Sequence, residues 1–189
     1  MNNVERIGRV IGRPVVSFGT ANRLGSIADL LIDPLSGELA GLAVKRADQT
    51  TALVSILDVH GFGPDAVIVD GDECLVLAEA SPLQRMPKAK QNLTGVKIIT
   101  EHGQVVGSIS DHFLCIARRP FFIYEARSSL FDKLLGRAFY FAASLGCAFS
   151  ADRTALIISA GPEQMDHRVE AVAERLLVRR VSGAAVPIW

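Results

Sequence analysis

The sequence predicts a mainly β fold, with two tandem small antiparallel β-barrels and a C-terminal amphipathic helix. Along residues 5–80, short apolar runs alternate with glycine, proline and aspartate turn signals and show no helical period. The stretch GSIAD, from Gly25 to Asp29, returns as GSISD from Gly107 to Asp111. Each copy follows a Gly-x-x-Val-Val or Gly-x-x-Ile-Ile run. This repetition predicts a duplicated β unit.

The composition is that of a globular protein and gives no support for nucleic-acid binding through bulk charge. Of the 189 residues, 49% are hydrophobic and 21% charged, and 20 basic residues balance 20 acidic ones. Three scattered cysteines, Cys74, Cys115 and Cys147, indicate buried free thiols in a reducing compartment. The start of the chain lacks the apolar segment of a signal peptide, and the longest apolar run is shorter than the ~20 residues that span a bilayer. We therefore expect a cytoplasmic protein.

The first predicted barrel occupies residues 5–80. Its strands are expected at residues 14–18, 24–33, 39–44, 52–57, 66–69 and 74–77. The segment from Asp33 to Gly37 (DPLSG) has the chemistry of a tight turn, because proline presets φ and glycine permits positive φ. Residues 81–92 contain two prolines and no periodicity, so an extended linker is expected there.

The second predicted barrel occupies residues 92–160. Strands are expected at residues 96–100, 104–116, 121–125, 138–144 and 154–159, with a helical insert near residues 129–136. A helix is predicted for residues 161–182, because Pro162 suits its first turn and an apolar stripe follows at a 3.6-residue period.

Aromatic residues concentrate in the second unit, and pairs such as Phe121-Phe122 place rings on both faces of one strand. Such a strand is either covered on both sides or exposes an apolar patch. The insert, the C-terminal helix, the first barrel or a partner chain could cover the outer face. The candidate interaction surface comprises ten residues of the strand, the insert and the helix: Phe121, Phe122, Leu130, Phe131, Leu134, Leu135, Met165, Val169, Val172 and Leu176.

Candidate chemical sites are weak by comparison. Asp29 and Asp111 occupy the same place in both units, and we expect each to accept hydrogen bonds from nearby turn N–H groups. The four histidines, His60, His102, His112 and His167, lack the spacing of a metal site. Ser108 lacks the second glycine of a nucleophile elbow. We therefore expect a protein that is not an enzyme and uses no metal or other cofactor.

The motifs resemble those of the PRC-barrel family. The residues concerned are Gly12 to Val16, Gly25 to Gly37 and, more loosely, Leu57 to Val67. Residues 5–80 match well, whereas residues 92–160 keep the glycines and Asp111 but lack the Asp-Pro-x-x-Gly turn. The resemblance implies a small β-barrel that acts as an adaptor or assembly module, without catalytic residues.

Three hypotheses of function follow. The first is a protein-interaction or assembly module that forms a homodimer through the second unit and the tail helix. The second is a ribosome- or RNA-associated factor, which needs a basic face that includes Arg118, Arg119, Arg179 and Arg180. The third is a peripheral membrane adaptor that uses the Leu130 to Leu135 insert or the Ile188-Trp189 end. DNA is not an expected partner.

Overall fold

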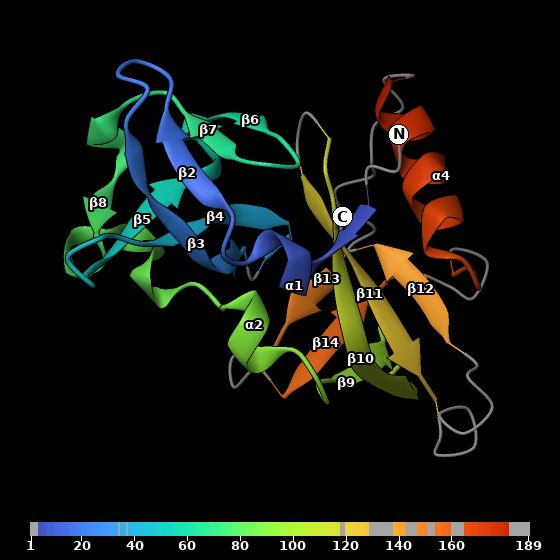
Figure 1. The fold of residues 1–189 in the computed structure, drawn as a ribbon. Coiled ribbons are helices and arrows are strands. Elements are labelled where there is room, and N and C mark those ends of the chain that lie inside the picture. The colour runs from blue at the N-terminus through green and yellow to red at the C-terminus, as the bar shows by residue number, and fades with distance from the viewer. Residues whose placement is uncertain are drawn as a thin grey trace. The chain divides into compact units, whose positions relative to one another are not determined.

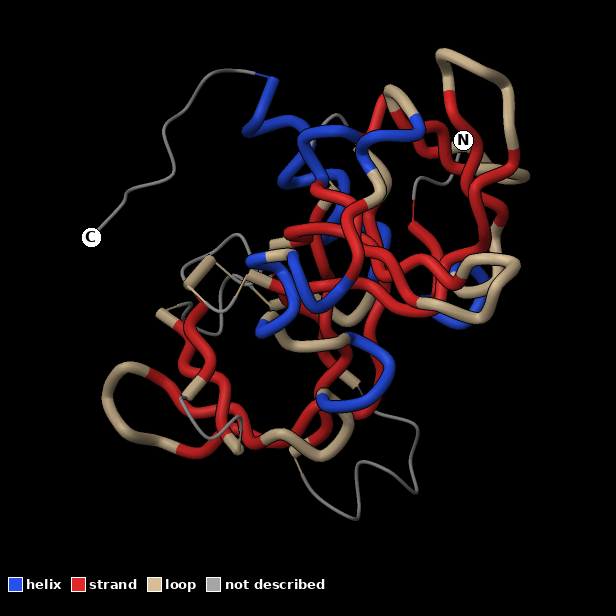
Figure 2. Tube along the Cα trace, turned by 90° about the vertical axis from the view of Figure 1, so that its left-hand side faces the viewer, coloured by secondary structure: helices blue, strands red, loops and turns tan. Residues whose placement is uncertain are grey.

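A computed structural model of the chain describes residues 4–33, 35–36, 38–117, 120–128, 138–142, 147–150, 154–159 and 165–181. These residues form two compact units. The N-terminal unit comprises Ile7–Asp33 and Leu39–Lys90, and the C-terminal unit comprises Met1–Arg6, Pro34–Glu38 and Gln91–Trp189. The fold is mainly β, and sheet strands curl into a half-barrel (Figures 1 and 2).

The N-terminal unit is built on one seven-stranded sheet among the residues described, in the order β6-β7-β2-β3-β4-β5-β8. Its strands are β2 (Pro14–Ser17), β3 (Arg23–Ile32), β4 (Leu39–Lys45), β5 (Thr51–Ser55), β6 (Val59–Phe62), β7 (Val67–Val69) and β8 (Val76–Leu77). Its short helices are α1 (Ile7–Val10), η1 (Ile56–Asp58), η2 (Asp72–Cys74), η3 (Ala78–Ala80) and η4 (Pro82–Arg85). The next helix, α2 (Ala89–Asn92), contains the boundary between the units.

The C-terminal unit has a sheet in the order β12-β11-β10-β9-β14-β13, and β1 pairs with β10 outside this path. Its elements are β1 (Val4–Arg6), β9 (Lys97–Thr100), β10 (Val105–Cys115), β11 (Phe121–Arg127), β12 (Phe139–Ala142), β13 (Cys147–Phe149), β14 (Ala155–Ile158) and α4 (Val169–Val181). The predicted insert near residues 129–136 lies outside the described residues.

The two sheets share one strand order, since β6-β7-β2-β3-β4-β5 corresponds to β13-β14-β9-β10-β11-β12. In both sheets the first long hairpin is antiparallel, but β2 pairs with β7, and β9 with β14, in parallel. The prediction of purely antiparallel sheets is therefore wrong at these two pairs. Turn signals locate strands along the chain, but they do not show in which direction a later strand rejoins the sheet.

Residues 81–90, predicted as part of an extended linker, pack on the N-terminal unit. Leu83 and Met86 contact a cluster of buried residues on one face of its sheet: Leu31, Ala43 and Leu53. The other face of β3 is also buried, which explains why Leu30, Leu31 and Ile32 form a continuous apolar run instead of alternating with polar residues. The prediction missed this because proline marks a break in regular structure and does not show what the segment packs against.

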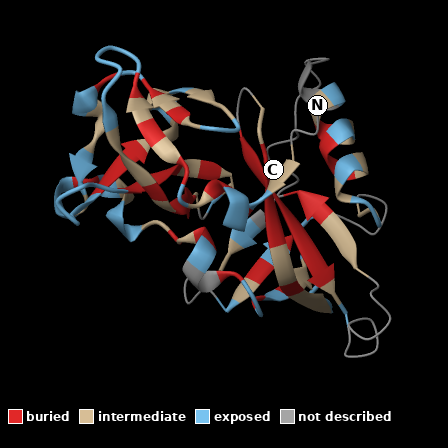
Figure 3. Ribbon diagram, viewed as in Figure 1, coloured by how far each residue is buried: buried red, intermediate tan, exposed pale blue. Residues whose placement is uncertain are grey.

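In the C-terminal unit, α4 covers one face of β11 and β12. Val172, Ala173 and Leu176 pack into a core that also contains Phe121 and Ile123. The buried residues of α4 lie on the side toward the sheet, and its outer side is exposed (Figure 3). The helix begins at Val169, later than predicted, because Asp166 is bonded to β12: its N–H and C=O exchange hydrogen bonds with those of Tyr140, 3.0 and 2.7 Å long.

Candidate functional site

The repeated motif residues perform the same backbone tasks in both units. Gly25 and Gly107 lie where a Cβ atom would approach the backbone oxygen of the neighbouring strand, at 2.5 Å from Lys45 and 2.6 Å from Arg127. The N–H of Gly12 donates to the Ile27 oxygen, 2.7 Å away, and the N–H of Gly95 makes the equivalent bond to the Ile109 oxygen. The motif therefore encodes close strand contact and a fixed entry into the sheet.

The paired aspartates each accept main-chain hydrogen bonds within their own unit, as predicted, but the donors lie in strands and in α2 and not in turns. Both follow a β-bulge, which lies between Ile27 and Asp29 in β3 and between Ile109 and Asp111 in β10. Asp29 Oδ1 accepts from the N–H of Leu30 at 2.8 Å and from that of Lys90 at 2.9 Å. Asp111 Oδ1 accepts from the following N–H at 2.8 Å. The carboxylates hold the bulge and, in Asp29, also the start of α2.

The structure places four of the ten predicted interaction residues in the interior. Phe121 and Phe122 are fully buried, and Val172 and Leu176 are only 2% and 3% exposed. Phe121 faces α4, whereas Phe122 lies on the opposite face of β11 and stacks with Tyr124 at a centroid separation of 6.2 Å. These four residues are thus core residues in the described fold and not a free surface. The C-terminal helix, one of the four covers considered, occupies the outer face.

The remaining members of the predicted surface divide into two groups. Val169 is partly buried against the α4 core, and Met165 is partly buried and precedes the helix. The four residues of the insert lie outside the described residues: Leu130, Phe131, Leu134 and Leu135.

A polar cluster lies on the same sheet face as the α4 core, and we take it as the candidate site. Glu125 of β11 is 5% exposed. Its Oε1 accepts hydrogen bonds from Ser110 Oγ at 2.9 Å and from Arg127 Nη2 at 2.8 Å and Nε at 3.1 Å. Its Oε2 accepts from the Tyr140 hydroxyl at 3.1 Å. One carboxylate therefore joins β10, β11 and β12.

The N-terminal unit has apolar residues at the corresponding positions. Glu125 pairs with Asp111 in β10 and with Tyr140 in β12, just as Ala43 pairs with Asp29 in β3 and with Leu53 in β5. The same strand arrangement therefore forms with Ala43 and Leu53 in the N-terminal unit and with Glu125 and Tyr140 in the C-terminal unit. The cluster is a feature of the C-terminal unit and not a requirement of the shared strand order.

The electrostatics of the cluster keep the protonation states of Glu125 and Tyr140 fixed near neutral pH. Burial raises the pKa of Glu125, but hydrogen bonds from Ser110, Arg127 and Tyr140 outweigh it, so its pKa lies below the ordinary value of 4.5. Burial, together with the negative charge of Glu125, raises the pKa of Tyr140 above 10.0. The carboxylate is charged, the phenol is neutral, and the arrangement suits structural cross-linking better than acid–base catalysis.

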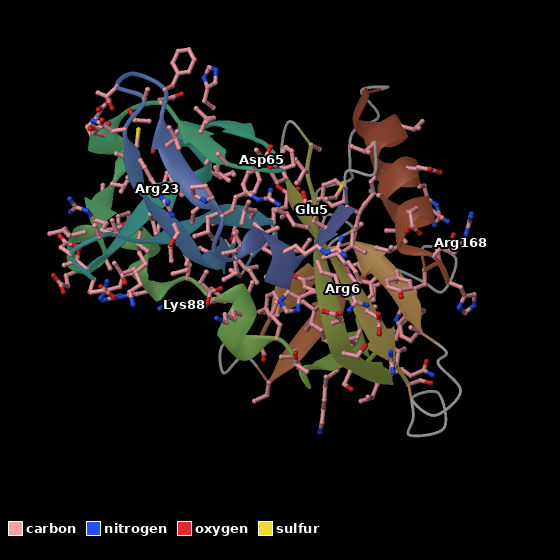
Figure 4. All side chains as sticks on the ribbon, viewed as in Figure 1. Glu5, Arg6, Arg23, Asp65, Lys88 and Arg168 are labelled. Atoms are coloured by element: carbon pink, nitrogen blue, oxygen red, sulfur yellow. The ribbon has the colours of Figure 1, made fainter. Side chains whose placement is uncertain are left out.

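Arg6 of β1, labelled in Figure 4, extends the cluster. Its Nη1 is 3.7 Å from Asp111 Oδ2, and its guanidinium carbon lies 5.6 Å from the centroid of the Phe113 ring. Sequence reasoning missed this cluster. The available signal was a glutamate and an arginine within the otherwise apolar run from Phe121 to Arg127, since a charge in a buried strand needs partners.

The histidines lie on separate elements. His60 stacks on the exposed ring of Phe18 at 4.4 Å, and His167 Nδ1 lies 3.0 Å from the Ala138 oxygen. His102 is beside Glu101, and His112 is buried. In the part of the chain that the structure describes, no three His, Cys, Asp or Glu side chains are grouped so as to bind a metal.

Of the predicted thiols, Cys115 is buried and Cys74 is partly exposed. Burial is the main cause that raises the pKa of the Cys74 thiol.

Among the arginines near the end of the chain, Arg175 Nη2 forms an ion pair with Asp166 Oδ2 at 3.0 Å. Arg118 and Arg119, and the side chains of Arg179 and Arg180, lie outside the described residues. Among the residues that the structure describes, no helix has the length and apolar character needed to cross a bilayer.

Comparison with known proteins finds limited similarity. No family model matches the chain. It is 29% identical over 135 residues to the uncharacterised protein YrrD of Bacillus subtilis. This match covers 67% of this chain and 72% of YrrD. It is 37% identical over 78 residues to mitochondrial escape protein 2 of Vanderwaltozyma polyspora, a match to 39% of this chain and only 9% of that protein. The similarity to YrrD extends over most of both chains, but it brings no known activity with it.

Proposed function

We propose that the chain is a non-enzymatic protein-interaction or assembly module made of two tandem PRC-barrel-like units, and that it self-associates as a cytoplasmic dimer. The observation that supports this most directly is that the residues repeated in both units have backbone roles, whereas the side chains at other equivalent positions differ in chemistry. The repeated ones, such as Gly25 and Gly107, serve the backbone in both sheets. The residues that differ, such as Glu125 against Ala43, are buried at equivalent positions of β11 and β4. A common strand scaffold that accepts different side chains suits a module adapted to different partners.

The chemistry of the polar cluster favours the same proposal. A general acid or base works best with a pKa near the working pH, and the shifts of Glu125 and Tyr140 run the other way. The RNA-associated alternative needs a basic face that includes Arg118, Arg119, Arg179 and Arg180, whose side chains lie outside the described residues, so it stays the alternative. The interaction module therefore remains the function that we put forward.

Size-exclusion chromatography with light scattering on the full chain tests the proposal. We expect a dimer mass that falls to the monomer mass on dilution. The control is the Leu77→Ser variant, which changes an exposed residue of β8 that is 46% exposed and outside the C-terminal unit. A monomer at every concentration, combined with no protein recovered by affinity capture from the native host, would contradict the proposal.

A further inference from the structure

The strand β1 completes the sheet of the C-terminal unit, although the chain continues from it directly into the N-terminal unit. Val4, Glu5 and Arg6 pair with Cys115, Leu114 and Phe113 in antiparallel register. The boundary between the units falls at the next peptide bond, between Arg6 and Ile7. Thus β1 is an arm: it is covalently attached to one unit and belongs to the other.

The N-terminal unit closes the same edge with the segment that leads into the C-terminal unit. Leu31 of β3 bridges to Lys88, and the N–H of Ile32 donates to the Pro87 oxygen at 2.9 Å. Leu31 and Phe113 each lie two residues after the motif aspartate, and their partners, Lys88 and Arg6, lie seven and six residues before Gly95 and Gly12. The two arms, residues 4–6 and 87–88, therefore occupy corresponding places that differ in register by one residue. Each arm pairs with the sheet of the unit that it does not precede.

The β10 edge requires a strand at this place. Leu114 and Cys115 are fully buried, so without β1 their main-chain groups would lose partners while shielded from water. Val4 adds apolar contact, since it packs on the core that contains Cys115, Phe121 and Leu176. The edge is thus a strand acceptor, with an apolar position for Val4 and, next to it, Phe113 and Asp111 to receive an arginine.

The Arg6 side chain of β1 is 65% exposed, so its ion pair with Asp111 is screened by solvent and contributes little to holding the strand. No contact of β1 with β10 depends on which molecule supplies the strand. Exchange between two copies therefore replaces each contact with an identical one.

We propose that two copies of this chain exchange their β1 strands, each placing Val4–Arg6 on the β10 edge of the other. This inference rests on the proposed self-association and specifies the segment that produces it. The occupant of the acceptor edge is the N-terminal arm of a second copy.

A disulfide trap uses a cysteine that the chain already has. Val4 lies directly opposite Cys115, so Val4→Cys places two thiols in cross-strand positions. The variant is made with Cys74 and Cys147 replaced by serine and is oxidised with oxidised glutathione, which accepts the two electrons. A β1 strand paired within its own chain gives a linked monomer; an exchanged strand gives a linked dimer. We expect linked dimer on a non-reducing gel, in a share that rises with protein concentration.

Two matched variants control for chance collisions. Glu5→Cys in the same background faces Leu114 and should form no Cys115 disulfide, and Val4→Cys combined with Cys115→Ser should form none either. Linked monomer alone at every concentration would overturn the exchange, and so would the absence of any Val4→Cys to Cys115 bond, because β1 would then not pair as described.

Light scattering on the same samples separates this inference from the proposed function. A dimer whose trap is entirely intramolecular keeps the proposed self-association and refutes the strand exchange. A monomer at every concentration refutes the self-association and the strand exchange together.

Discussion

Gly25 shows how a single repeated residue determines the approach of two strands. A Cβ atom there would lie 2.5 Å from the Lys45 oxygen and 2.7 Å from a Val44 side-chain carbon. We therefore expect Gly25→Ala to lower the free energy of unfolding by about 1–3 kcal/mol, as overpacking does. Urea denaturation measures the change. Gly61→Ala is the matched control, because Gly61 is also in a strand and has no atom within 4 Å of the added carbon. Equal losses in the two variants would refute the argument.

Glu125 is the residue at which the C-terminal unit departs most from its counterpart. Replacing it with Gln removes a charged acceptor of four hydrogen bonds, and we expect a loss of about 1.5–3 kcal/mol at neutral pH. Tyr140→Phe removes one hydroxyl and should cost about 1 kcal/mol. Glu79→Gln, at an exposed position, should be close to neutral.

The pH dependence of these variants follows from the lowered pKa of Glu125. A carboxylate with a folded-state pKa below 4.5 contributes stability that is present above 4.5 and is lost as the pH falls through the folded-state value. The difference between wild type and Glu125→Gln should therefore be largest near neutral pH and shrink on acidification below 4.5. Urea denaturation across this range tests it, and a difference that grows on acidification would contradict the assigned hydrogen bonds.

At the scale of elements, α4 stabilises the sheet by covering β11 in the same chain. Leu176→Ala opens a cavity in that core and should cost about 2–5 kcal/mol in the free energy of unfolding. Val178, on the same helix, is 68% exposed, and Val178→Ala should change it by less than about 0.5 kcal/mol. The two variants share a helix and differ in burial. A loss at Leu176 no larger than that at Val178 would mean that α4 does not pack here.

The elements that the sequence allowed us to predict are those whose signal is local. Strands such as β3 and β10 follow from apolar runs between turn residues, and their equivalence follows from GSIAD and GSISD. The segments at 4–6 and 87–88 have no such signal, because three or fewer residues show no period. Their structure depends on the β10 and β3 edges that they pair with. The burial of Phe121 could not be predicted either. The sequence did not show whether the insert, the C-terminal helix, the first barrel or a partner chain would pack on it.

At the scale of the whole molecule, the two arms, residues 4–6 and 87–88, predict that the chain does not divide cleanly at the boundary between its units. A fragment of residues 7–90 retains its own edge segment, Pro87 and Lys88, and we expect it to unfold cooperatively. A fragment of residues 91–189 lacks β1, which leaves the β10 edge open beside Leu114 and Cys115. It also lacks Glu38, which belongs to the same unit and bridges to Phe121. We expect this fragment to be less stable.

A peptide of residues 1–8 should restore the part of that stability that β1 contributes, because it supplies the missing strand. Binding to the folded state should raise the midpoint of unfolding as the peptide concentration rises. The same peptide with Val4→Asp should fail, since it would bury a charge in the core next to Cys115 and Phe121. Thermal unfolding followed by circular dichroism measures both. If fragment 91–189 is equally stable with and without the peptide, β1 adds nothing to the sheet, and the two units are closed without their arms.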